Sequence, residues 1–531
     1  MNYPGRSQTY IRFTLTMQES GGVLTPAPLR ANRADAVIDT DHAGRAHIPG
    51  SSLAGALRAA VAAGPPATRA LANCFGDVTE DTAVASAIWV LGAYLDADEA
   101  SVDPTVTRQS AQWTEAVDEG FARERASTGT EVWTQRRQWM STAIDRATGA
   151  ARNATLRQIE FLPAGTSFTA YLRWDDATEA DVQQFVDLLR TWRPTIGRAA
   201  STGHGRCAVP KVWVGTLDLT TPEHLKLWLT MAGPELFDKV STDERQHSQG
   251  TPPPTTTPAV LVVPLRTEGP LVIGAQGAAE RHTGPMRTRR LHASDGKLAL
   301  AVPGTAIKGV VRSRMEYILR SLDLPACVQE SYGTCLPCQF FGHTDKRAQT
   351  TSVGRRGAVR VENSFVTPQQ GWTAESMLRV RTHVPLDRFT GGAGRKSPTD
   401  AKIHPPSERG GMLHQIEGIE GGEFDLTFDV TRLDPETKED FAALLRLVVE
   451  DLHDGLTGFG HAVNRGYGSV RVRSLEEAGV RVKGSELKIE DLPTGKQARA
   501  RMSFIAERHT RHQAEQEALP EERRPRECGN G

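Results

Sequence analysis

The sequence predicts an α+β protein with two ferredoxin-like domains, and two observations lead to this prediction. The first is a phrase that occurs twice, IPGSSLAGALRAA at 48–60 and VPGTAIKGVVRSR at 302–314, about half a chain apart. The second is the order of expected elements, which in each half reads strand, helix, strand, strand, helix, strand. A phrase repeated at this distance indicates a duplicated unit.

Two further phrases recur in the same order. IDRATGA at 144–150 corresponds to LDRFTGG at 386–392, and IGRAASTGHGRCAV at 196–209 corresponds to FGHAVNRGYGSVRV at 459–472. Three collinear matches are not expected by chance, so the two halves are predicted to be homologous domains.

The expected elements follow from apolar periodicity and turn residues. In the first half we expect strands at 10–17, 166–174 and 207–214, and helices after Pro49 and over 178–192. In the second half we expect strands at 259–265, 423–430 and 469–474, and helices after Thr305 and over 436–453. The segments 75–165 and 325–420 are too long for plain loops and are expected to be insertions.

Domain boundaries follow from composition. Residues 1–241 are expected to form the first domain and 259–474 the second. The stretch 242–258, TDERQHSQGTPPPTTTP, is polar and proline-rich and is predicted to be a linker. Residues 475–531 are charged and are expected to be a solvated helix or disordered.

The overall composition excludes few functions. The chain has 531 residues with 63 basic and 64 acidic side chains, so net charge neither supports nor excludes nucleic acid, although arginines cluster at 281–290 and 355–360. No apolar run is long enough to span a membrane, and the N-terminus lacks the apolar core of a signal peptide. Six cysteines, three of them between 327 and 338, suit a reducing cytoplasm better than a disulfide framework.

The Pro-Gly phrase suggests a phosphate site. We expect Ser51 and Thr305 to cap a helix through their hydroxyl groups, with Arg58 and Arg312 two turns further on. Gly55 and Gly309 would let another backbone approach. A capped helix N-terminus with free N–H groups suits phosphate, although an ordinary capped helix is the alternative interpretation.

Cys327, Cys335 and Cys338 have the spacing C-x7-C-x2-C. A C-x2-C pair supplies half of a tetrahedral zinc site, and His343 or His292 could supply the fourth ligand. Three buried thiols are the alternative. The first half keeps only Cys74 at the corresponding place, so no zinc is expected there.

Taken as a set, the three phrases resemble the RAMP superfamily, and more narrowly the backbone subunits of type III CRISPR interference complexes. QFFG at 339–342, RVENSFV at 360–366 and VPLDRFTGGA are similar to that family's phrasing. The resemblance covers about 8–215 and 258–474, so the chain looks like two backbone subunits fused together.

The resemblance implies an RNA-recognition-like ferredoxin core in each half, with a thumb hairpin that wedges into the guide–target duplex. It implies guide RNA, target RNA and other CRISPR effector subunits as partners. It also implies a structural Zn²⁺ in the insertion of the second domain.

The catalytic residue that the resemblance implies is Asp35, which precedes Val37 and Ile38 in the loop before the Pro-Gly turn. Asp39 and Asp41 lie nearby and could be confused with it. A carboxylate can hold Mg²⁺ or a similar divalent ion, and the 2′-hydroxyl of RNA supplies the nucleophile. A solvated loop aspartate is the alternative.

The second half departs from the family pattern at this place. Thr283, Gly284 and Pro285 stand where the family has its aspartate. The second site is therefore expected to be inactive, unless Glu280 or His282 substitutes.

The remaining candidate residues are expected to bind RNA backbone. Arg146 and Arg388 begin the thumb phrases and either contact phosphate or pair with the preceding aspartate. The glycines are expected to let backbone N–H groups approach phosphates. The predicted RNA-binding set is Ser51, Ser52, Arg58, Arg146, Gly203, Gly205, Thr305, Lys308, Arg312, Arg388, Gly466 and Gly468.

Three functions compete. The first is a cytoplasmic guide-RNA-binding backbone subunit that cuts target RNA at one metal-dependent site in the first domain. The second is an inert RNA-binding scaffold. The third is a guide-RNA-processing RAMP endoribonuclease that uses a histidine such as His204 or His461.

Overall fold

The protein is described from a computed structural model. The structure describes residues 6–26, 35–42, 44–78, 83–96, 137–145, 152–246, 259–275, 286–293, 297–327, 335–344, 354–384, 386, 414–473 and 491–517. The chain divides into two compact units. The first comprises Met1–Ala143, Arg152–Thr257 and Leu291–Leu298, and the second comprises Ile144–Ala151, Pro258–Arg290 and Ala299–Gly531. Among the helices of the described residues, none has the length and apolar character needed to span a bilayer.

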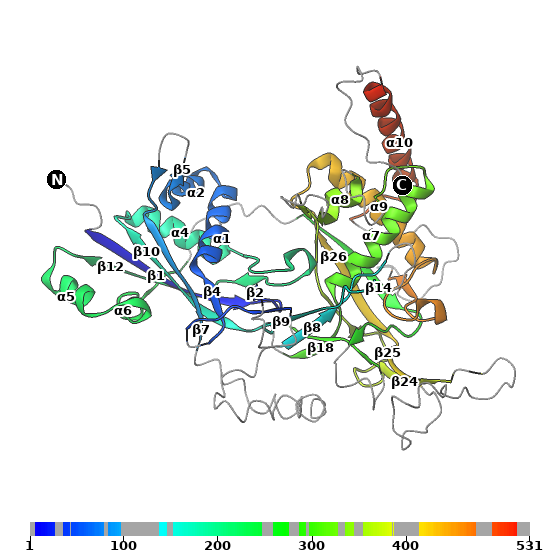
Figure 1. Cartoon of the computed structure of the whole chain (residues 1–531), viewed down its shortest axis with the longest axis horizontal. Coiled ribbons are helices and arrows are strands. Elements are labelled where there is room, and N and C mark those ends of the chain that lie inside the picture. Colours follow the sequence, from blue (N-terminus) through cyan, green and yellow to red (C-terminus); the bar gives the residue numbers. More distant parts are fainter. Residues whose placement is uncertain are drawn as a thin grey trace. The chain divides into compact units, whose positions relative to one another are not determined.

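The first half of the chain carries the elements of the first unit (Figure 1). Its strands are β1 (Ser7–Met17), β2 (Leu24–Pro26), β3 (Ala36–Ile38), β4 (His47–Pro49), β5 (Asp77–Val78), β6 (Ala83–Val84), β7 (Ile88–Leu95), β8 (Arg137–Ser141), β9 (Arg157–Phe161), β10 (Ser167–Asp175), β11 (Cys207–Ala208), β12 (Val212–Asp218) and β13 (Asp243–Glu244). Its helices are α1 (Gly50–Ala63), α2 (Pro66–Ala70), η1 (Leu71–Phe75), α4 (Glu179–Thr191), η4 (Ala200–Thr202), α5 (Pro222–Thr230) and α6 (Gly233–Val240).

The core sheet of the second half has fewer strands than that of the first half, and the two helices that pack on it are longer. Its strands are β14 (Val260–Thr267), β15 (Gly274–Ala275), β16 (Arg287–Thr288), β17 (Arg290–His292), β18 (Leu298–Val302), β19 (Gly342–Thr344), β20 (Gly354–Arg356), β21 (Arg360–Val361), β22 (Ser364–Phe365), β23 (Thr367–Pro368), β24 (Leu378–His383), β25 (His414–Ile419), β26 (Gly422–Asp429) and β27 (Val470–Val472). Its helices are α7 (Gly304–Ser321), α8 (Leu336–Phe341), α9 (Pro435–His453), η7 (Val463–Arg465) and α10 (Gly495–Glu517).

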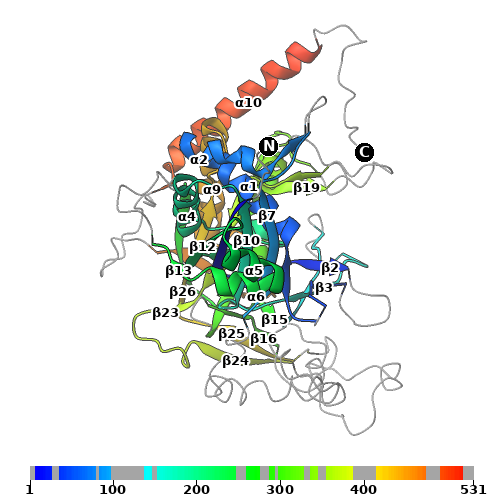
Figure 2. The same ribbon diagram turned by 90° about the vertical axis from the view of Figure 1, so that its left-hand side faces the viewer.

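The core sheet of the first unit has the order β13-β12-β1-β10-β7-β4, with β11 also paired to β1, and its neighbours are antiparallel. Side chains alternate across β1, so that Ile11, Phe13 and Leu15 face one side, where they pack in one apolar core with α1 and α4. On the other side Tyr10 packs with Phe237 of α6. Figure 2 shows α5 and α6 over β10 and β12.

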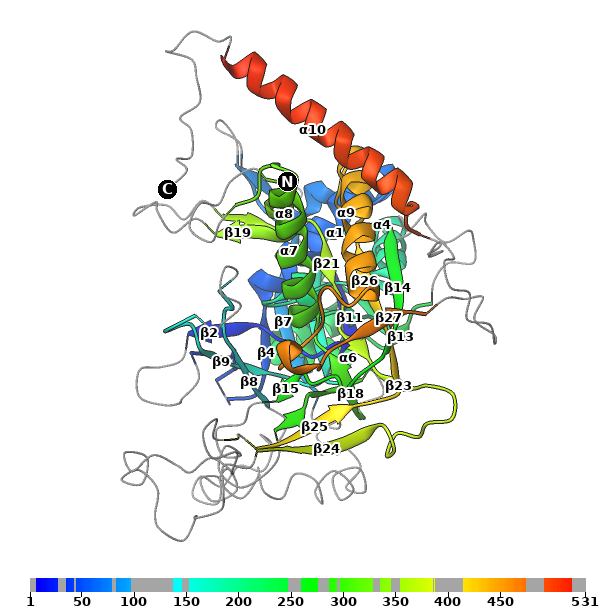
Figure 3. The ribbon, with the colours of Figure 1, turned by 90° about the vertical axis from the view of Figure 1, so that its right-hand side faces the viewer.

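The second unit repeats this arrangement. Its sheet has the order β21-β26-β14-β27, again antiparallel, and α7 and α9 share its apolar core (Figure 3). The last, first, third and second strands of each unit are therefore neighbours in that order, which is the ferredoxin-like topology. The predicted fold class, α+β with two ferredoxin-like domains, is confirmed.

Individual residues also occupy equivalent positions in the two units. The side chain of Thr178 caps α4 by accepting a hydrogen bond from the N–H of Asp181, and Asp434 caps α9 in the same way from the N–H of Thr437. Seven residues after each cap, Phe185 and Phe441 are fully buried. The Pro-Gly helices α1 and α7 both connect the first and second core strands, so they are topologically equivalent, as predicted.

Each unit also carries a β-hairpin outside its core sheet. In the first, β8 pairs antiparallel with β9, and in the second β24 pairs with β25. Ile144 and Leu386, which open the two thumb phrases, follow the last paired residues Ser141 and His383 by the same number of positions. The predicted thumb insertions therefore rest on hairpins.

Several regions differ from expectation. In the second unit the second core strand, β21, lies inside the stretch 325–420 that was expected to be an insertion. The second core strand of the first unit, β7, lies inside the stretch 75–165 that was expected to be an insertion, because a bulge at Gly92 breaks its alternation. The stretch predicted as a linker begins with β13, which pairs with β12.

The C-terminal segment is neither a solvated helix nor disordered over its described part. Helix α10 packs along α9, and Ala498, Met502 and Ile505 enter the core of the second unit. The buried carboxylate of Asp440 on α9 accepts hydrogen bonds from Arg501 at 2.7 Å and from Arg508 at 3.0 Å. Small and apolar residues at helical spacing explain this docking, although charged residues dominate the sequence around them.

Replacing Asp440 with Ala should release α10. The change removes a buried carboxylate from two arginines, at a cost of about 2–4 kcal/mol, because breaking a buried ion pair leaves its partners uncompensated. Hydrogen exchange of the α10 amides should become faster.

Glu436→Ala is the matched control, since Glu436 contacts the same Arg508 but is 58% exposed. An exposed pair contributes less than about 1 kcal/mol, so exchange in α10 should change little. Equal exchange rates in the two variants would contradict this account.

Candidate functional site

Asp35 is exposed and held by the hairpin of the first unit. Strand β3 runs parallel to β9, with Ala36 opposite Ile159. The Oδ2 of Asp35 accepts a hydrogen bond from the N–H of Gln158 at 2.8 Å, and its own N–H donates to the Gln158 carbonyl at 2.7 Å. Among the described residues Oδ1 has no hydrogen-bond or ion-pair partner. One carboxylate oxygen is therefore oriented and accessible to a cation.

The two neighbouring aspartates are engaged in the turn that precedes α1. The Asp41 side chain is 3% exposed and accepts hydrogen bonds from the backbone N–H of Arg45 at 2.8 Å and from its Nε at 2.9 Å. Asp39 Oδ2 lies 3.4 Å from Nδ1 of His47. Of the three, Asp35 is the most accessible.

The second unit lacks a carboxylate at the equivalent position. Met286 bridges Ile416 in parallel orientation, as Ala36 bridges Ile159. The residue before Met286 in the sequence is Pro285, which therefore corresponds to Asp35. Glu280, His282, Thr283 and Pro285 lie outside the described residues.

One buried glutamate in each unit connects the segment before the Pro-Gly helix to the hairpin. The sequence analysis did not identify these two residues. Glu160 accepts a hydrogen bond from the N–H of Ile38 at 3.1 Å, and Glu417 accepts one from Thr288 at 3.2 Å. Glu417 also pairs with Arg290. Both glutamates end the phrase Gln-Ile-Glu, at 158–160 and 415–417, a fourth repeat that could have revealed them.

Both Pro-Gly helices begin at Gly50 and Gly304, with Pro49 and Pro303 at the N-cap, two residues before the predicted caps. The prediction that Ser51 and Thr305 cap them is wrong, and in α7 the N–H of Gly304 donates to the side chain of Asn363 instead. The reason is that β4 runs directly into α1: Pro49 still pairs with Gly92. Ser51, Ser52 and Thr305 are exposed in the first turn.

The glycines of these phrases have different roles from those expected. A Cβ on Gly50 would lie 2.3 Å from the carbonyl oxygen of Val90, so a backbone approaches there. A Cβ on Gly55 or Gly309 would meet nothing within 4 Å, so no described part of the protein packs closely against them. Both glycines are exposed, one helical turn after Ser51 and Thr305. Because they have no side chain, nothing projects from the helix there.

The two helix arginines differ. Arg58 is exposed, whereas the Arg312 side chain is 13% exposed and points into the second unit. Its Nε donates to Glu316 at 2.9 Å, its Nη1 to the carbonyl of Gly342 at 2.7 Å, and its Nη2 contacts Sγ of Cys338 at 3.5 Å. Arg312 therefore joins α7 to the cysteine cluster, a geometry that does not favour its predicted contact with RNA.

Lys308 lies one turn before Arg312 and is half-buried, with its ammonium 5.9 Å from the ring centre of Phe341. Burial, together with the charge of the neighbouring Arg312, lowers the pKa of Lys308 to about 8. Its counterpart in α1 is Ala54.

The glycine-rich loops do not present all their N–H groups. The N–H of Gly205 donates to the carbonyl of Ser20 at 3.0 Å, and that of Gly468 to Pro270 at 2.9 Å. The prediction that these two groups approach phosphate is therefore wrong. Gly203 is buried, while Gly466 is exposed. Arg146 and Arg388 lie outside the described residues.

The structure brings Cys327, Cys335 and Cys338 together. Their Sγ atoms all lie within 4.8 Å of one another, and those of Cys327 and Cys338 are 3.7 Å apart. Thiolates around a tetrahedral zinc with bonds of about 2.3 Å are roughly 3.8 Å apart, so the cluster fits a metal ion. Hydrogen bonds with the other two thiols and burial raise the pKa of Cys335.

The structure does not place the predicted histidine with the three thiols, and the fourth ligand stays a prediction. His343 on β19 and His292 on β17 do not belong to the cluster, and among the described residues no other histidine, aspartate or glutamate joins it. Cys74 of the first unit is half-buried and has no cysteine cluster around it in the part of the chain described.

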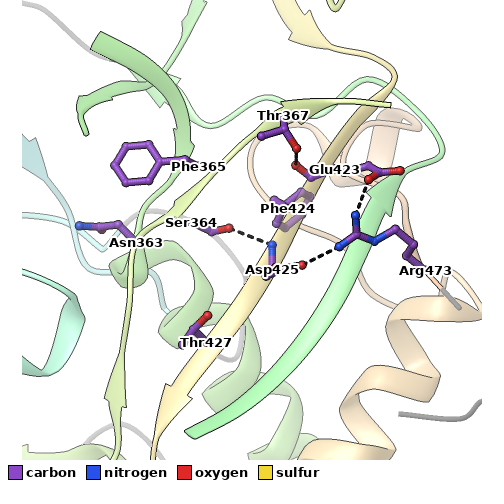
Figure 4. Close-up of a pocket in the computed structure, with 9 residues that line it drawn as sticks. All are labelled: Asn363, Ser364, Phe365, Thr367, Glu423, Phe424, Asp425, Thr427 and Arg473. Carbon is purple, nitrogen blue, oxygen red and sulfur yellow. Dashed lines mark hydrogen bonds and ion pairs between the residues drawn. The ribbon is translucent and has the colours of Figure 1, made fainter. Parts of the chain in front are cut away.

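A polar cavity of about 310 Å³ lies on the sheet face of the second unit that α7 and α9 do not cover (Figure 4). Its carboxylates, Glu423 and Asp425, both pair with Arg473, which is 3.0 Å from Asp425. Because the guanidinium already binds an oxygen of each carboxylate, the cavity is less suited to a metal cation.

Comparison with known proteins agrees with the duplicated architecture. The family model of the RAMP superfamily matches residues 21–208 and 264–471, one segment in each half of the chain. No match was found among curated proteins.

Among solved structures 173 chains match. One, from a cryo-EM structure of the Type III-B Cmr-beta bound to cognate target RNA, is 14% identical, with 38% of this chain and 96% of that chain covered and a TM-score of 0.29. Another, from the apo state of Type III-B Cmr-beta, is 12% identical with the same coverage and a TM-score of 0.27. Since the family model matches well over half of the chain, in two copies, the protein belongs to the RAMP superfamily.

Proposed function

We propose that the chain is a guide-RNA-binding backbone subunit of a type III CRISPR effector complex that cuts target RNA at one metal-dependent site beside Asp35. Its partners are guide RNA, target RNA and other effector subunits, in the cytoplasm. Family membership and the motif set support the backbone role. The observation that carries the cutting site is the contrast between an exposed, oriented Asp35 and the proline at the equivalent position of the second unit.

Cleavage of the target RNA would require only a few groups from the protein. Mg²⁺ or a similar ion, when bound at Oδ1 of Asp35, would polarise a phosphate and stabilise the leaving oxygen. The N–H of Gln158 holds Oδ2 and so orients the carboxylate. The 2′-hydroxyl of the target is the nucleophile, so no side chain has to act as one.

RNA would lie on both Pro-Gly helices. Their first turns expose the hydroxyls of Ser51, Ser52 and Thr305 at the positive end of the helix, a pattern that suits phosphate. The open surface over Gly55 and Gly309 would let a nucleic-acid backbone approach closely. Arg146 and Arg388, which follow the paired parts of β8 and β24 in the sequence, would contact phosphate as well.

We propose domains at 1–241 and 259–474, joined by a linker at 242–258 and followed by a C-terminal segment at 475–531. The first domain would carry the cut and the second the metal-bound insertion.

An inert scaffold is the second candidate, because Asp39 and Asp41 are engaged elsewhere and leave a single accessible carboxylate. A guide-processing role is less well supported, since His204 is buried. Burial and Arg465 lower the pKa of His461, which favours its neutral form.

Asp35→Asn should keep the hydrogen bond to Gln158 but remove the charge. Metal-dependent cutting of target RNA by the assembled complex should fall at least about 100-fold, since a metal-held charge supplies several kcal/mol, while target affinity stays constant. Gel analysis of end-labelled target at saturating concentration measures this.

Asp39→Asn is the matched control in the same loop and should cut normally. Loss of cutting in Asp39→Asn alone would move the site within the loop. Normal cutting in both variants would favour the scaffold, and metal-independent cutting of the guide precursor would favour the third function.

RNA affinity should depend on pH through Lys308. Its ammonium is charged below its pKa of about 8 and neutral above it, so its attraction for phosphate weakens as pH rises through that value. Guide affinity at fixed salt should fall by about threefold or more between about pH 7 and pH 9.

Lys308→Arg stays charged throughout this range and should bind equally at both pH values. If wild type and this variant show the same pH dependence, Lys308 does not contact the guide.

The cysteine cluster should hold one zinc per chain when the protein is purified without chelator. Cys335→Ser and Cys338→Ser should lose it. Arg312→Met removes a hydrogen-bond donor to Cys338, and loss of such a partner weakens metal binding by roughly 10-fold. Competition with a chromophoric chelator measures the affinity, and zinc-free wild-type protein would refute the site.

A further inference from the structure

Each glycine-rich loop holds one buried ring at its centre. His204 in the first unit and Tyr467 in the second occupy the same position in the repeat, and they are 1% and 3% exposed. The glycines on either side have positive φ, which turns the chain sharply around the ring. These angles are 81° at Gly203, 73° at Gly205, 83° at Gly466 and 76° at Gly468.

In the first unit the ring packs against the hairpin. His204 stacks on Phe161 of β9, with ring centroids 4.8 Å apart and an angle of 12° between the planes. Its Nδ1 lies 3.1 Å from the carbonyl oxygen of Ser20, at the end of the first core strand. The ring therefore connects the core sheet to the hairpin.

In the second unit a different ring makes the equivalent connection. The hydroxyl of Tyr467 lies 2.5 Å from Nε2 of His383 on β24, with ring centroids 5.6 Å apart. Tyr467 also packs in one apolar cluster with Val272 and with Ile416 of β25. Different chemistry at the same place indicates that the connection itself is what both units retain.

The loop has no room to shift under the ring. A Cβ on Gly205 would lie 2.1 Å from the carbonyl oxygen of Ile196, and one on Gly468 would lie 2.0 Å from that of Phe459. Each glycine N–H also donates to a carbonyl beyond the first core strand, Ser20 or Pro270. The ring is thus held on a rigid support.

We propose that the central ring of each glycine-rich loop is a positioning residue that fixes the hairpin to the ferredoxin-like core. In the first unit, β9 carries the N–H of Gln158 that holds Asp35, three residues before Phe161. His204 therefore positions Asp35 through β9. This consequence for cutting rests on the proposed function, whereas the anchoring of the hairpin does not.

The same contacts argue against a direct role of the buried ring in RNA chemistry. A ring stacked inside the unit offers no surface to a nucleobase, and the N–H groups of Gly205 and Gly468 already have acceptors. Both units have a ring between two glycines because the contact between loop and hairpin needs glycines with positive φ and a flat side chain between them.

Hydrogen exchange measured by mass spectrometry on the full chain tests the anchor without RNA. His204→Ala should speed exchange in β8 and β9 by at least ~10-fold, because the hairpin opens locally. His204→Phe keeps the stacking and should restore slow exchange. Val186→Ala removes part of a fully buried side chain on α4 and is the control for general destabilisation, with hairpin exchange unchanged.

Cutting by the assembled complex then separates positioning from binding. With His204→Ala the rate at saturating target should fall at least ~10-fold while target affinity holds, and His204→Phe should recover most of the rate. Unchanged hairpin exchange in His204→Ala would overturn the proposal. So would equal loss of cutting in both variants, which would make the imidazole itself the active group. A wild-type complex that does not cut would refute the proposed function but leave the exchange result valid.

Discussion

The close packing of backbone at one glycine in each unit is the constraint on which the rest of the structure depends. Gly205 and Gly468 sit against a carbonyl oxygen of their own loop at a distance that no side chain would tolerate. Their N–H groups tie the loop to the end of the first core strand. Because that strand is inside each sheet, this contact sets the position of the loop and of the hairpin beside it relative to the core sheet.

The repeated phrases predicted the fold well because they mark places where the backbone permits few residues. Gly50, Gly205 and Gly468 each lack room for a Cβ, so their spacing in the sequence reflects real geometry. The alternation of apolar and polar residues did not predict β7, because a β-bulge next to Gly92 interrupts that alternation. The sequence pattern also failed in the C-terminal segment, where charge dominates the composition although Ala498, Met502 and Ile505 form a narrow apolar stripe.

The candidate site was less predictable, because residue type does not reveal which way a side chain points. Arg58 and Arg312 stand at the same place in the phrase, yet one is exposed and the other bonds Glu316 and Gly342 inside the unit. Ser51 looks like a helix cap, but the strand β4 continues to Pro49 and moves the helix start. The cysteine spacing was informative because thiols at C-x2-C spacing meet wherever the turn after Cys335 forms.

The two units show how a duplicated fold can divide its tasks. The first keeps an accessible carboxylate at Asp35, and the second has Pro285 at that position, Lys308 in its helix and a cysteine cluster beside Arg312. These differences leave the contact between glycine loop and hairpin in place in both units. The contact between glycine loop and hairpin accepts either a histidine or a tyrosine ring. It therefore constrains the shape of the side chain at that position, while residues on the surface of the unit can differ. Divergence of the sites therefore required no change in the frame that holds them.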